Sequence, residues 1–305
     1  MNPHHRPAFS RFDPAAWEIR AAGAVDRLQL TRLIDTARWR HQHLDWTDAL
    51  SLLGQQPFLL AYERARPVAC LACPPDLPEL TWLRLFALAG GRDLGEAWSA
   101  LWPAARLQLQ EAGVREAWAL ATYTWLLPLL AEAGFRAAGG VVFLESSETP
   151  IEPPRAALGK IRTMTRNDWS GVLSLDHRAF EPAWRLSPAG LHAASAQAAM
   201  ATVIESDGRL LGYQISTSSA FGVHLARLAV EPEVQSHGLG TALVADTLVQ
   251  AARLGTARIS VNTQSENSVS RRLYARMGFR ETGQEFPVLR LGWAPLQTKD
   301  GNALV

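Results

Sequence analysis

A glycine-containing turn between a strand and a helix is the first feature of this sequence that could bind a ligand. In the segment ARLAVEPEVQSHGLGTALVADTL, a strand predicted to end at Val230 leads through Gly238 and Gly240 directly into a helix. Glycines let the backbone approach a ligand closely, and the first N–H groups of a helix have no partner within it. Such a turn can bind a diphosphate without a charged side chain. A dinucleotide fingerprint does not fit, because its third glycine would fall at Leu243.

A second group of residues with useful chemistry follows in VNTQSENSVSRRLYARMGF, where Asn267, Tyr274, Gly278 and Phe279 lie around a predicted short helix. The Asn267 amide can bind a ligand or cap that helix. The Tyr274 phenol, with an ordinary pKa near 10, can donate a proton.

The two motifs together resemble the GCN5-related N-acetyltransferase (GNAT) family. In that family a loop of the form Arg/Gln-x-x-Gly-x-Gly/Ala binds the diphosphate of acetyl-CoA, and Gln235, Gly238 and Gly240 match it position by position. The resemblance covers about residues 158–295 and implies acetyl-CoA as cofactor. The residues that it implies for cofactor binding are Leu228, Ala229, Val230, Gln235, Ser236, His237, Gly238, Leu239, Gly240, Thr241, Asn267 and Arg271.

The resemblance also implies a reaction, in which an amine attacks the acetyl thioester directly within a ternary complex. Tyr274 is the expected proton donor to the CoA sulfur. Some relatives carry a Glu four residues before the Leu-Ala-Val anchor, and that position here is His224, whose ordinary pKa near 6.5 suits a base. Others carry a Glu where this chain has Asn262, which cannot act as a base. Proton loss through ordered water remains an alternative.

The acceptor is expected to be a small molecule or peptide with a primary amine. In such a fold its pocket is usually built by the loop around the first two helices and by the last hairpin. Phe180, Trp184 and Phe286 are therefore expected as apolar walls, with Asp176 or Glu181 attracting a cationic amine.

An internal repeat shows which elements must position these residues. Four signposts recur at offsets of 142 to 144 residues: an Ile-Arg strand, a hairpin, a helix end at glycine before a strand, and a Gly-Phe pair. The repeat predicts two tandem GNAT-like domains at 15–147 and 158–296, joined by a Pro-rich linker at 148–157.

Each half is predicted to be α/β, with a mixed, mostly antiparallel sheet flanked by helices. The elements expected in the second half are strands at 160–164, 200–216 (a hairpin), 223–231, 257–263 and 286–293, and helices at 167–180, 238–254 and 267–276.

The first half lacks the functional residues of the second. An offset of 144 places Leu94 and Glu96 opposite Gly238 and Gly240, and Leu130 opposite Tyr274. An acidic side chain at the helix start would repel a diphosphate, and leucine cannot donate a proton. The first half is therefore expected to be a degenerate copy.

Composition limits the other possibilities. The 305 residues carry 30 Lys+Arg and 29 Asp+Glu, so no overall charge favours nucleic acid or a membrane surface as partner. The only cysteines, Cys70 and Cys73, lack the second Cys/His pair of a zinc site, and no metal is expected. We expect a cytoplasmic monomer or homodimer.

Two alternatives to a general N-acetyltransferase remain. One is a mycothiol-synthase-like acetyltransferase, which is similar in being a tandem pair with one competent half. The other is a non-catalytic acyl-CoA-binding sensor or scaffold. The presence of Tyr274 and Asn267 favours an enzyme.

Overall fold

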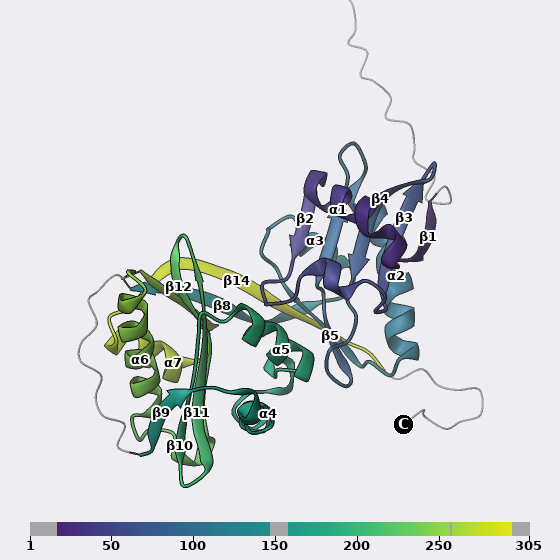
Figure 1. Cartoon of the computed structure of the whole chain (residues 1–305). Helices are drawn as coiled ribbons and strands as arrows, with labels where there is room; N and C mark the ends of the chain where they lie inside the picture. The colour runs from purple at the N-terminus through teal and green to yellow at the C-terminus, as the bar shows by residue number, and fades with distance from the viewer. Residues whose placement is uncertain (1–16, 147–157, 257, 295–305) are drawn as a thin grey trace, which may run out of the picture.

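The computed structural model describes residues 17–146, 158–256 and 258–294, and shows two sheets flanked by helices (Figure 1). The linker expected at 148–157 lies outside the described residues. The strands are β1 (Glu18–Ala21), β2 (Trp39–Gln42), β3 (Phe58–Glu63), β4 (Arg66–Ala72), β5 (Leu80–Trp82), β6 (Leu85–Leu88), β7 (Glu116–Leu120), β8 (Arg136–Ser146), β9 (Lys160–Thr163), β10 (Met200–Ser206), β11 (Arg209–Ser219), β12 (Gly222–Val230), β13 (Ile259–Gln264) and β14 (Arg280–Gly292). The α-helices are α1 (Arg27–Thr36), α2 (Leu94–Glu111), α3 (Leu126–Glu132), α4 (Trp169–Ala179), α5 (Pro188–Gln197), α6 (Leu239–Arg253) and α7 (Ser268–Arg276).

The predicted α/β class with mixed, mostly antiparallel sheets is confirmed. A five-stranded sheet has the order β1-β3-β4-β6-β2 and is antiparallel throughout. A nine-stranded sheet has the order β5-β7-β14-β8-β13-β12-β11-β10-β9. Among the described strands, its only parallel pairs are β5 with β7 and β12 with β13.

The last strands of the two halves are exchanged. Strand β8, from the first half, pairs with β13 of the second half. Strand β14, from the second half, lies between β7 and β8 and pairs with both. Figure 1 shows β8 and β14 running side by side between the two halves. The sequence repeat predicts two similar halves, but it carries no information on this exchange, because strand partners depend on contacts far apart in the chain.

The repeat is visible in matching ion pairs. Arg20 binds Asp26 at 2.5 Å, and Arg162 binds Asp168 at 2.8 Å, so both partners of the second pair lie 142 residues after those of the first. In each half the aspartate also accepts a backbone N–H at the start of a helical turn. The Arg20 guanidinium lowers the pKa of Asp26 to about 2, and Arg162 lowers that of Asp168 in the same way.

Helix α6 is fixed against the sheet of the second half. Leu239, Leu243, Val244 and Leu248 are buried on its sheet-facing side, as the helical spacing predicts.

Helix α5 was not expected from the sequence. Ser187 caps it by accepting the N–H of Gly190 at 2.8 Å. Among the described residues, no helix is long and apolar enough to cross a membrane.

Candidate functional site

Strands β12 and β13 separate midway, which opens a place for an extended ligand. They pair in parallel only over residues 223–225 of β12 and 259–261 of β13. Just beyond, Ala226 is an extra residue in β12, a bulge whose neighbours pair with adjacent residues of β11. A bulge bends its strand and increases its twist. Residues 228–230 keep their bonds to β11 and, within the described chain, have no strand on their other edge.

The turn after β12 is held by an ion pair between a buried carboxylate and a half-exposed arginine. Glu231, 1% exposed, accepts hydrogen bonds from the Arg178 guanidinium at 2.8 and 2.6 Å. Arg178 lowers the pKa of Glu231, which therefore stays ionised at neutral pH. The start of the turn is thereby tied to the end of α4.

The backbone of this turn favours glycine at the position that caps α6. Gly238 is the N-cap of α6 with a φ of +80°, and Ser236 is also left-handed with a φ of +68°. A Cβ on Gly238 would meet no atom within 4 Å, so backbone conformation alone favours glycine there. No side chain of a described residue caps α6. Its first N–H groups and the positive end of its dipole are therefore available to an anion.

The other residues of the turn shape it. Gly240 lets α6 approach α7, since a Cβ there would lie 3.1 Å from Leu273 Cδ2. The Gln235 amide donates to the carbonyl of Val230 at 3.2 Å, and His237 Nδ1 donates to the carbonyl of Gln235 at 2.9 Å. The expected cofactor residues from Gln235 to Thr241 are thus continuous, with four in the turn and three in the first turn of α6.

Three expected residues on and before α7 have different surroundings. Asn267 caps α7 by accepting the N–H of Ser270 at 3.0 Å. Arg271 is bound to Glu281 at 2.7 Å and to the carbonyl of Ser265 at 2.9 Å, which directs its guanidinium toward β14. Tyr274 is 4% exposed, and burial raises the pKa of its phenol, which is protonated at neutral pH.

His224 lies on β12 where the two strands are still paired. Its Nε2 donates to Asn262 Oδ1 at 2.9 Å, and its Nδ1 accepts from the hydroxyl of Ser260 at 2.9 Å, in the tautomer that satisfies both contacts. Burial lowers the pKa of His224 below its usual value, so the ring is neutral at neutral pH. The structure thus joins the two base positions considered from sequence, because His224 and Asn262 are bonded to each other.

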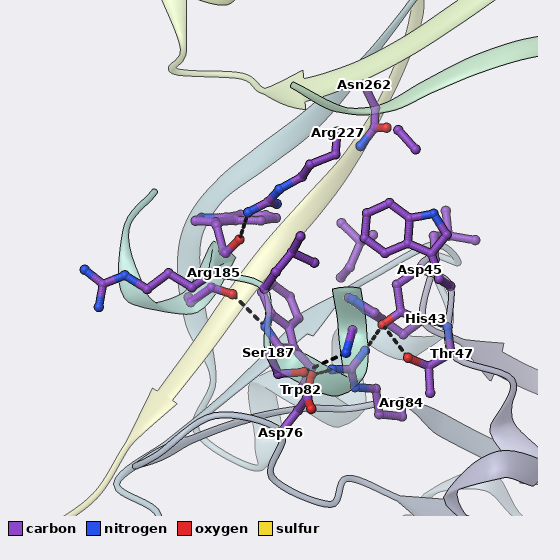
Figure 2. Close-up of a pocket in the computed structure, with 18 of the residues that line it drawn as sticks. His43, Asp45, Thr47, Asp76, Trp82, Arg84, Arg185, Ser187, Arg227 and Asn262 are labelled. Atoms are coloured by element: carbon purple, nitrogen blue, oxygen red, sulfur yellow. Dashed lines mark hydrogen bonds and ion pairs between the residues drawn. The ribbon is translucent and has the colours of Figure 1, made fainter. Parts of the chain in front are cut away.

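A cavity of about 750 Å³ opens beside His224 and is lined by both halves of the chain. His224, Ala226, Arg227 and Asn262 contribute from the separating strands. The first half contributes the segment 43–47 and residues around β5. Figure 2 shows Asn262 and Arg227 at one end, with residues of the first half at the other. The volume suits a small-molecule ligand.

The three expected wall residues are not brought together in this cavity. Trp184 lines it, whereas Phe286 lines a neighbouring hollow of about 500 Å³. Phe180 is covered by the Arg227 guanidinium, whose Cζ lies 3.6 Å from the ring centroid. Asp176 is fully buried and bound to Arg227 at 2.5 Å, so the expectation that it attracts the acceptor amine is wrong.

The equivalent place in the first half is filled by the chain itself. Strand β6 corresponds to residues 227–230, since each pairs with the matching strand of its own hairpin. Its other edge, which is free in the second half, is paired with β2 from Trp39 opposite Leu88 to Gln42 opposite Leu85. No edge remains there for an extended ligand.

The helix start of the first half differs as well. The N-caps Asp93 and Gly238 correspond, so the expected offset of 144 is wrong by one residue, and Asp93 rather than Leu94 replaces Gly238. The offset changes within the turn after the strand. Leu88 and Val230 lie 142 residues apart, but the turn is three residues shorter in the first half, so the two N-caps lie 145 residues apart. The Asp93 carboxylate accepts the N–H of Glu96 at 2.9 Å and occupies the helix end.

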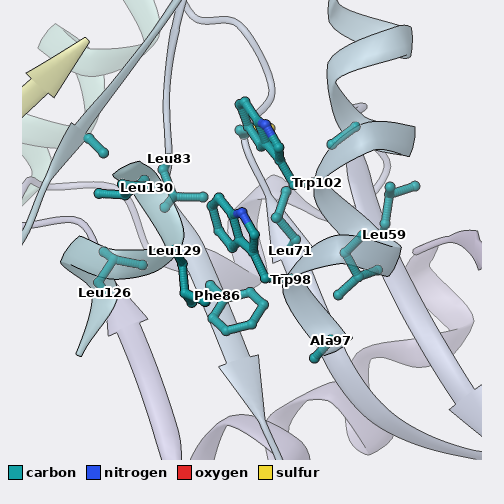
Figure 3. Close-up of a cluster of buried hydrophobic side chains, with 14 of the residues drawn as sticks. Leu59, Leu71, Leu83, Phe86, Ala97, Trp98, Trp102, Leu126, Leu129 and Leu130 are labelled. Atoms are coloured by element: carbon teal, nitrogen blue, oxygen red, sulfur yellow. The ribbon is translucent and has the colours of Figure 1, made fainter. Parts of the chain in front are cut away.

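Apolar side chains fill the remaining space in the first half. Trp98 and Trp102 of α2 stack with ring centroids 5.5 Å apart. The ring of Phe86 in β6 packs edge-on against Trp98, with ring centroids 5.4 Å apart (Figure 3). Leu130, opposite Tyr274 as expected, is fully buried; each residue accepts the N–H of the Phe five positions later. The tryptophans of α2 therefore belong to the core of this half.

Several cavity residues were not found by sequence reasoning. His43, Asp45, Asp76 and Arg84 come from loops of the first half, and Arg227 from β12. They belong to no motif, and only tertiary packing brings them to the second half. The stretch RHQHLDW was the only available signal, as a polar segment flanked by tryptophans in a half otherwise rich in core residues.

Comparisons with known proteins find relatives among the acetyltransferases. The acetyltransferase (GNAT) family matches residues 169–279. An uncharacterized N-acetyltransferase of Methanocaldococcus jannaschii is 32% identical over 80 residues, which are 26% of this chain and 51% of that protein. The match thus spans about half the length of this curated relative.

Solved structures resemble the whole chain at low identity. A GCN5-related N-acetyltransferase from Sphaerobacter thermophilus has a TM-score of 0.61 at 15% identity, covering 91% of this chain and 96% of that one. A tandem GNAT protein from the clavulanic acid biosynthesis pathway has a TM-score of 0.65 at 17% identity, covering 92% and 99%. A putative acetyltransferase from Pyrococcus horikoshii has a TM-score of 0.63 at 17% identity, covering 98% and 96%. These likenesses show the fold.

Proposed function

We propose, from the premise that this chain belongs through residues 169–279 to the acetyltransferase (GNAT) family, that its second half transfers an acetyl group from acetyl-CoA to an amine. One observation carries the proposal: a free strand edge at 228–230 runs into an uncapped helix start at Gly238 in the second half only. Acetyl-CoA supplies an activated thioester, a long amide-bearing arm and a diphosphate, and these two features match the arm and the diphosphate.

The residues present suit the cofactor. The backbone of Leu228, Ala229 and Val230 can pair with an extended arm in the way that a strand adds to a sheet edge. The N–H groups of residues 238–241 would bind the diphosphate without a basic side chain. Arg271 is left out of this set, because Glu281 and the carbonyl of Ser265 already bind its guanidinium.

The chemistry requires a proton to leave the amine and a proton to reach the sulfur. The C–N bond forms as the C–S bond breaks, and Tyr274, which stays protonated because burial raises its phenol pKa, is the proposed donor to the departing thiolate. His224 is the proposed acceptor of the amine proton. Its accepting nitrogen is Nδ1, where the amine or a water would take the place of the Ser260 hydroxyl. His224 is kept neutral by burial and lines the cavity of about 750 Å³, which we propose as the acceptor cavity.

Calorimetry with the full chain tests the cofactor site. We expect one CoA per chain, because β2 and Asp93 occupy both parts of the equivalent place in the first half. Two equivalent sites, or none, would contradict the assignment.

Thiol release from acetyl-CoA, followed over a panel of amines and peptides, tests the reaction. Release that depends on the amine and yields the acetamide supports an enzyme. CoA binding without release for any acceptor would instead favour the acyl-CoA-binding sensor.

A further inference from the structure

The charged side chains that line the acceptor cavity neutralise one another, with one exception. Arg227 is bound by the buried Asp176, with 2.5 Å from its Nη2 to Oδ2. Arg84, whose side chain is 9% exposed, is paired closely with Asp45. The remaining acid, Asp76, lies 3.6 Å from Arg84 Nη2, beyond hydrogen-bond distance, and makes no hydrogen bond to any other described residue. Its side chain is 37% exposed.

The other charged lining residues do not offset the negative charge of Asp76. Asp45 is fully used, because besides Arg84 it accepts the N–H of Thr47 at 2.8 Å and the hydroxyl of Thr47 at 3.3 Å. Arg185 donates its Nε–H to the carbonyl of Phe180, and Figure 2 shows its guanidinium directed away from Asp76. The end of the cavity at Asp76 therefore carries a net negative charge.

Two aromatic rings line the same cavity as this carboxylate. Trp82 and Trp184 have ring centroids 5.3 Å apart, and both line the cavity with Asp76. The indole Nε1 of Trp82 donates to the carbonyl of Ala183 at 2.9 Å, which fixes the ring. Trp82 is only 6% exposed, but the indole surface that the two rings leave open to the cavity attracts cations, as the carboxylate does.

A buried nitrogen in the same wall lacks a partner. His43 lies against Trp82 with ring centroids 4.8 Å apart, and its Nδ1 is buried with no hydrogen-bond partner in the described chain. Burial lowers the pKa of His43 well below its usual value, so the ring is neutral and one ring nitrogen can accept a hydrogen bond. An unpaired buried polar atom is costly, and because Nδ1 has almost no exposed surface, a ligand donor would satisfy it once the ring turns slightly toward the cavity.

We propose that Asp76, Trp82 and His43 form a subsite for a second cationic group of the acceptor. The acceptor class is then an amine that carries another amine or a guanidine at its far end. One amine would lie at the His224 end and be acetylated, while the other would be held by the first half. This inference rests on the proposed function, and it gives the degenerate half a role in acceptor selection.

Binding to the CoA-loaded full chain, measured by calorimetry, tests the subsite without requiring turnover. The probes are the α,ω-diamines from diaminopropane to diaminooctane and p-xylylenediamine, each paired with the monoamine of the same skeleton. At least one diamine is expected to bind roughly tenfold or more tightly than its monoamine, as a charge-assisted hydrogen bond predicts. With that diamine, Asp76→Asn should abolish the difference and Asp76→Glu should restore part of it.

The matched control is Asp207→Asn, which removes a carboxylate from the exposed turn between β10 and β11, away from the cavity lining. It should leave the preference for the diamine unchanged. Thermal melting checks that the Asp76 variants are folded. Equal binding of every diamine and its monoamine, no binding of any diamine, or a preference that survives Asp76→Asn would overturn the inference. Prior titration with CoA separates these results from failure of the proposed function, which would appear as loss of CoA binding itself.

Discussion

Replacing Gly238 with aspartate should weaken CoA binding through charge, and asparagine at the same position is the matched neutral variant. The change reproduces in the second half the acidic N-cap that Asp93 provides in the first. Both variants must adopt the φ of +80°, which Asn and Asp tolerate better than other non-glycine residues. A Cβ at this position meets no atom within 4 Å, so neither variant introduces a clash. The pair therefore differs in charge alone.

The magnitude follows from the geometry of the helix start. A carboxylate at the N-cap and a diphosphate on the first N–H groups would lie about 6 Å apart, which gives about 3 kcal/mol of repulsion per unit charge at an effective dielectric constant of about 20, and about 0.7 kcal/mol in bulk water. Gly238 is exposed, so the true value lies between these limits. We expect Gly238→Asp to bind CoA roughly 5- to 100-fold more weakly than Gly238→Asn.

Calorimetric titration of both variants at low and high salt decides the matter. The difference between Asp and Asn should shrink as salt rises, because exposed charges are screened. Equal affinities for the two variants at low salt would refute the placement of the diphosphate at this helix start.

Three further predictions concern other residues. Tyr274→Phe should lower kcat roughly tenfold to thousandfold with little change in CoA affinity. Thermal stability should be nearly unchanged, because the phenol has no hydrogen bond to a described residue. If kcat is unchanged while chemistry is rate-limiting, Tyr274 is not the proton donor. His224 must be neutral to accept a proton, and burial lowers its pKa. The acidic limb of kcat/KM should therefore lie below pH 6.5 and disappear in His224→Gln. A limb that follows the pKa of the acceptor amine and survives the substitution would show that His224 does not accept the proton. Asp26 has a folded pKa of about 2, below its unfolded value near 3.8, so its contribution to stability is present above about pH 4 and is lost as pH falls toward 2. The stability of Asp26→Asn should therefore fall less between about pH 4 and about pH 2 than that of the unchanged protein. Identical pH dependence of stability in the two proteins would show that the ion pair does not stabilise the fold.

The features that the sequence predicts best are those encoded locally. The turn from Gln235 to Gly240 and the helix that follows are specified by residues adjacent in the chain, and the structure contains both. The Ile-Arg signposts also mark a real repeat, since Arg20 and Arg162 make the same ion pair. The bulge at Ala226 depends on how β12 pairs with β11, and no residue type requires it.

Features that depend on distant contacts escaped prediction. Asp176 has the charge expected of an acceptor-binding residue, but Arg227 and Tyr213 pair with it inside the core. Asp76 and Arg84 precede and follow β5 in the first half, and nothing in their local sequence indicates that they line a cavity of the second. Electrostatic roles of this kind are set by which charges meet after folding.

The exchanged strands have a practical consequence for dissecting this protein. A fragment ending near residue 146 would lack β14 and leave β7 and β8 without the strand that lies between them. A fragment beginning near residue 158 would lack β8 and expose an edge of β13. Bare edges invite association with other chains, so either half expressed alone should aggregate or pair with a second copy. When the two fragments are produced in the same cell, each can cover the exposed strand edges of the other, and both should become soluble. This property makes the chain a candidate for a split-protein reporter.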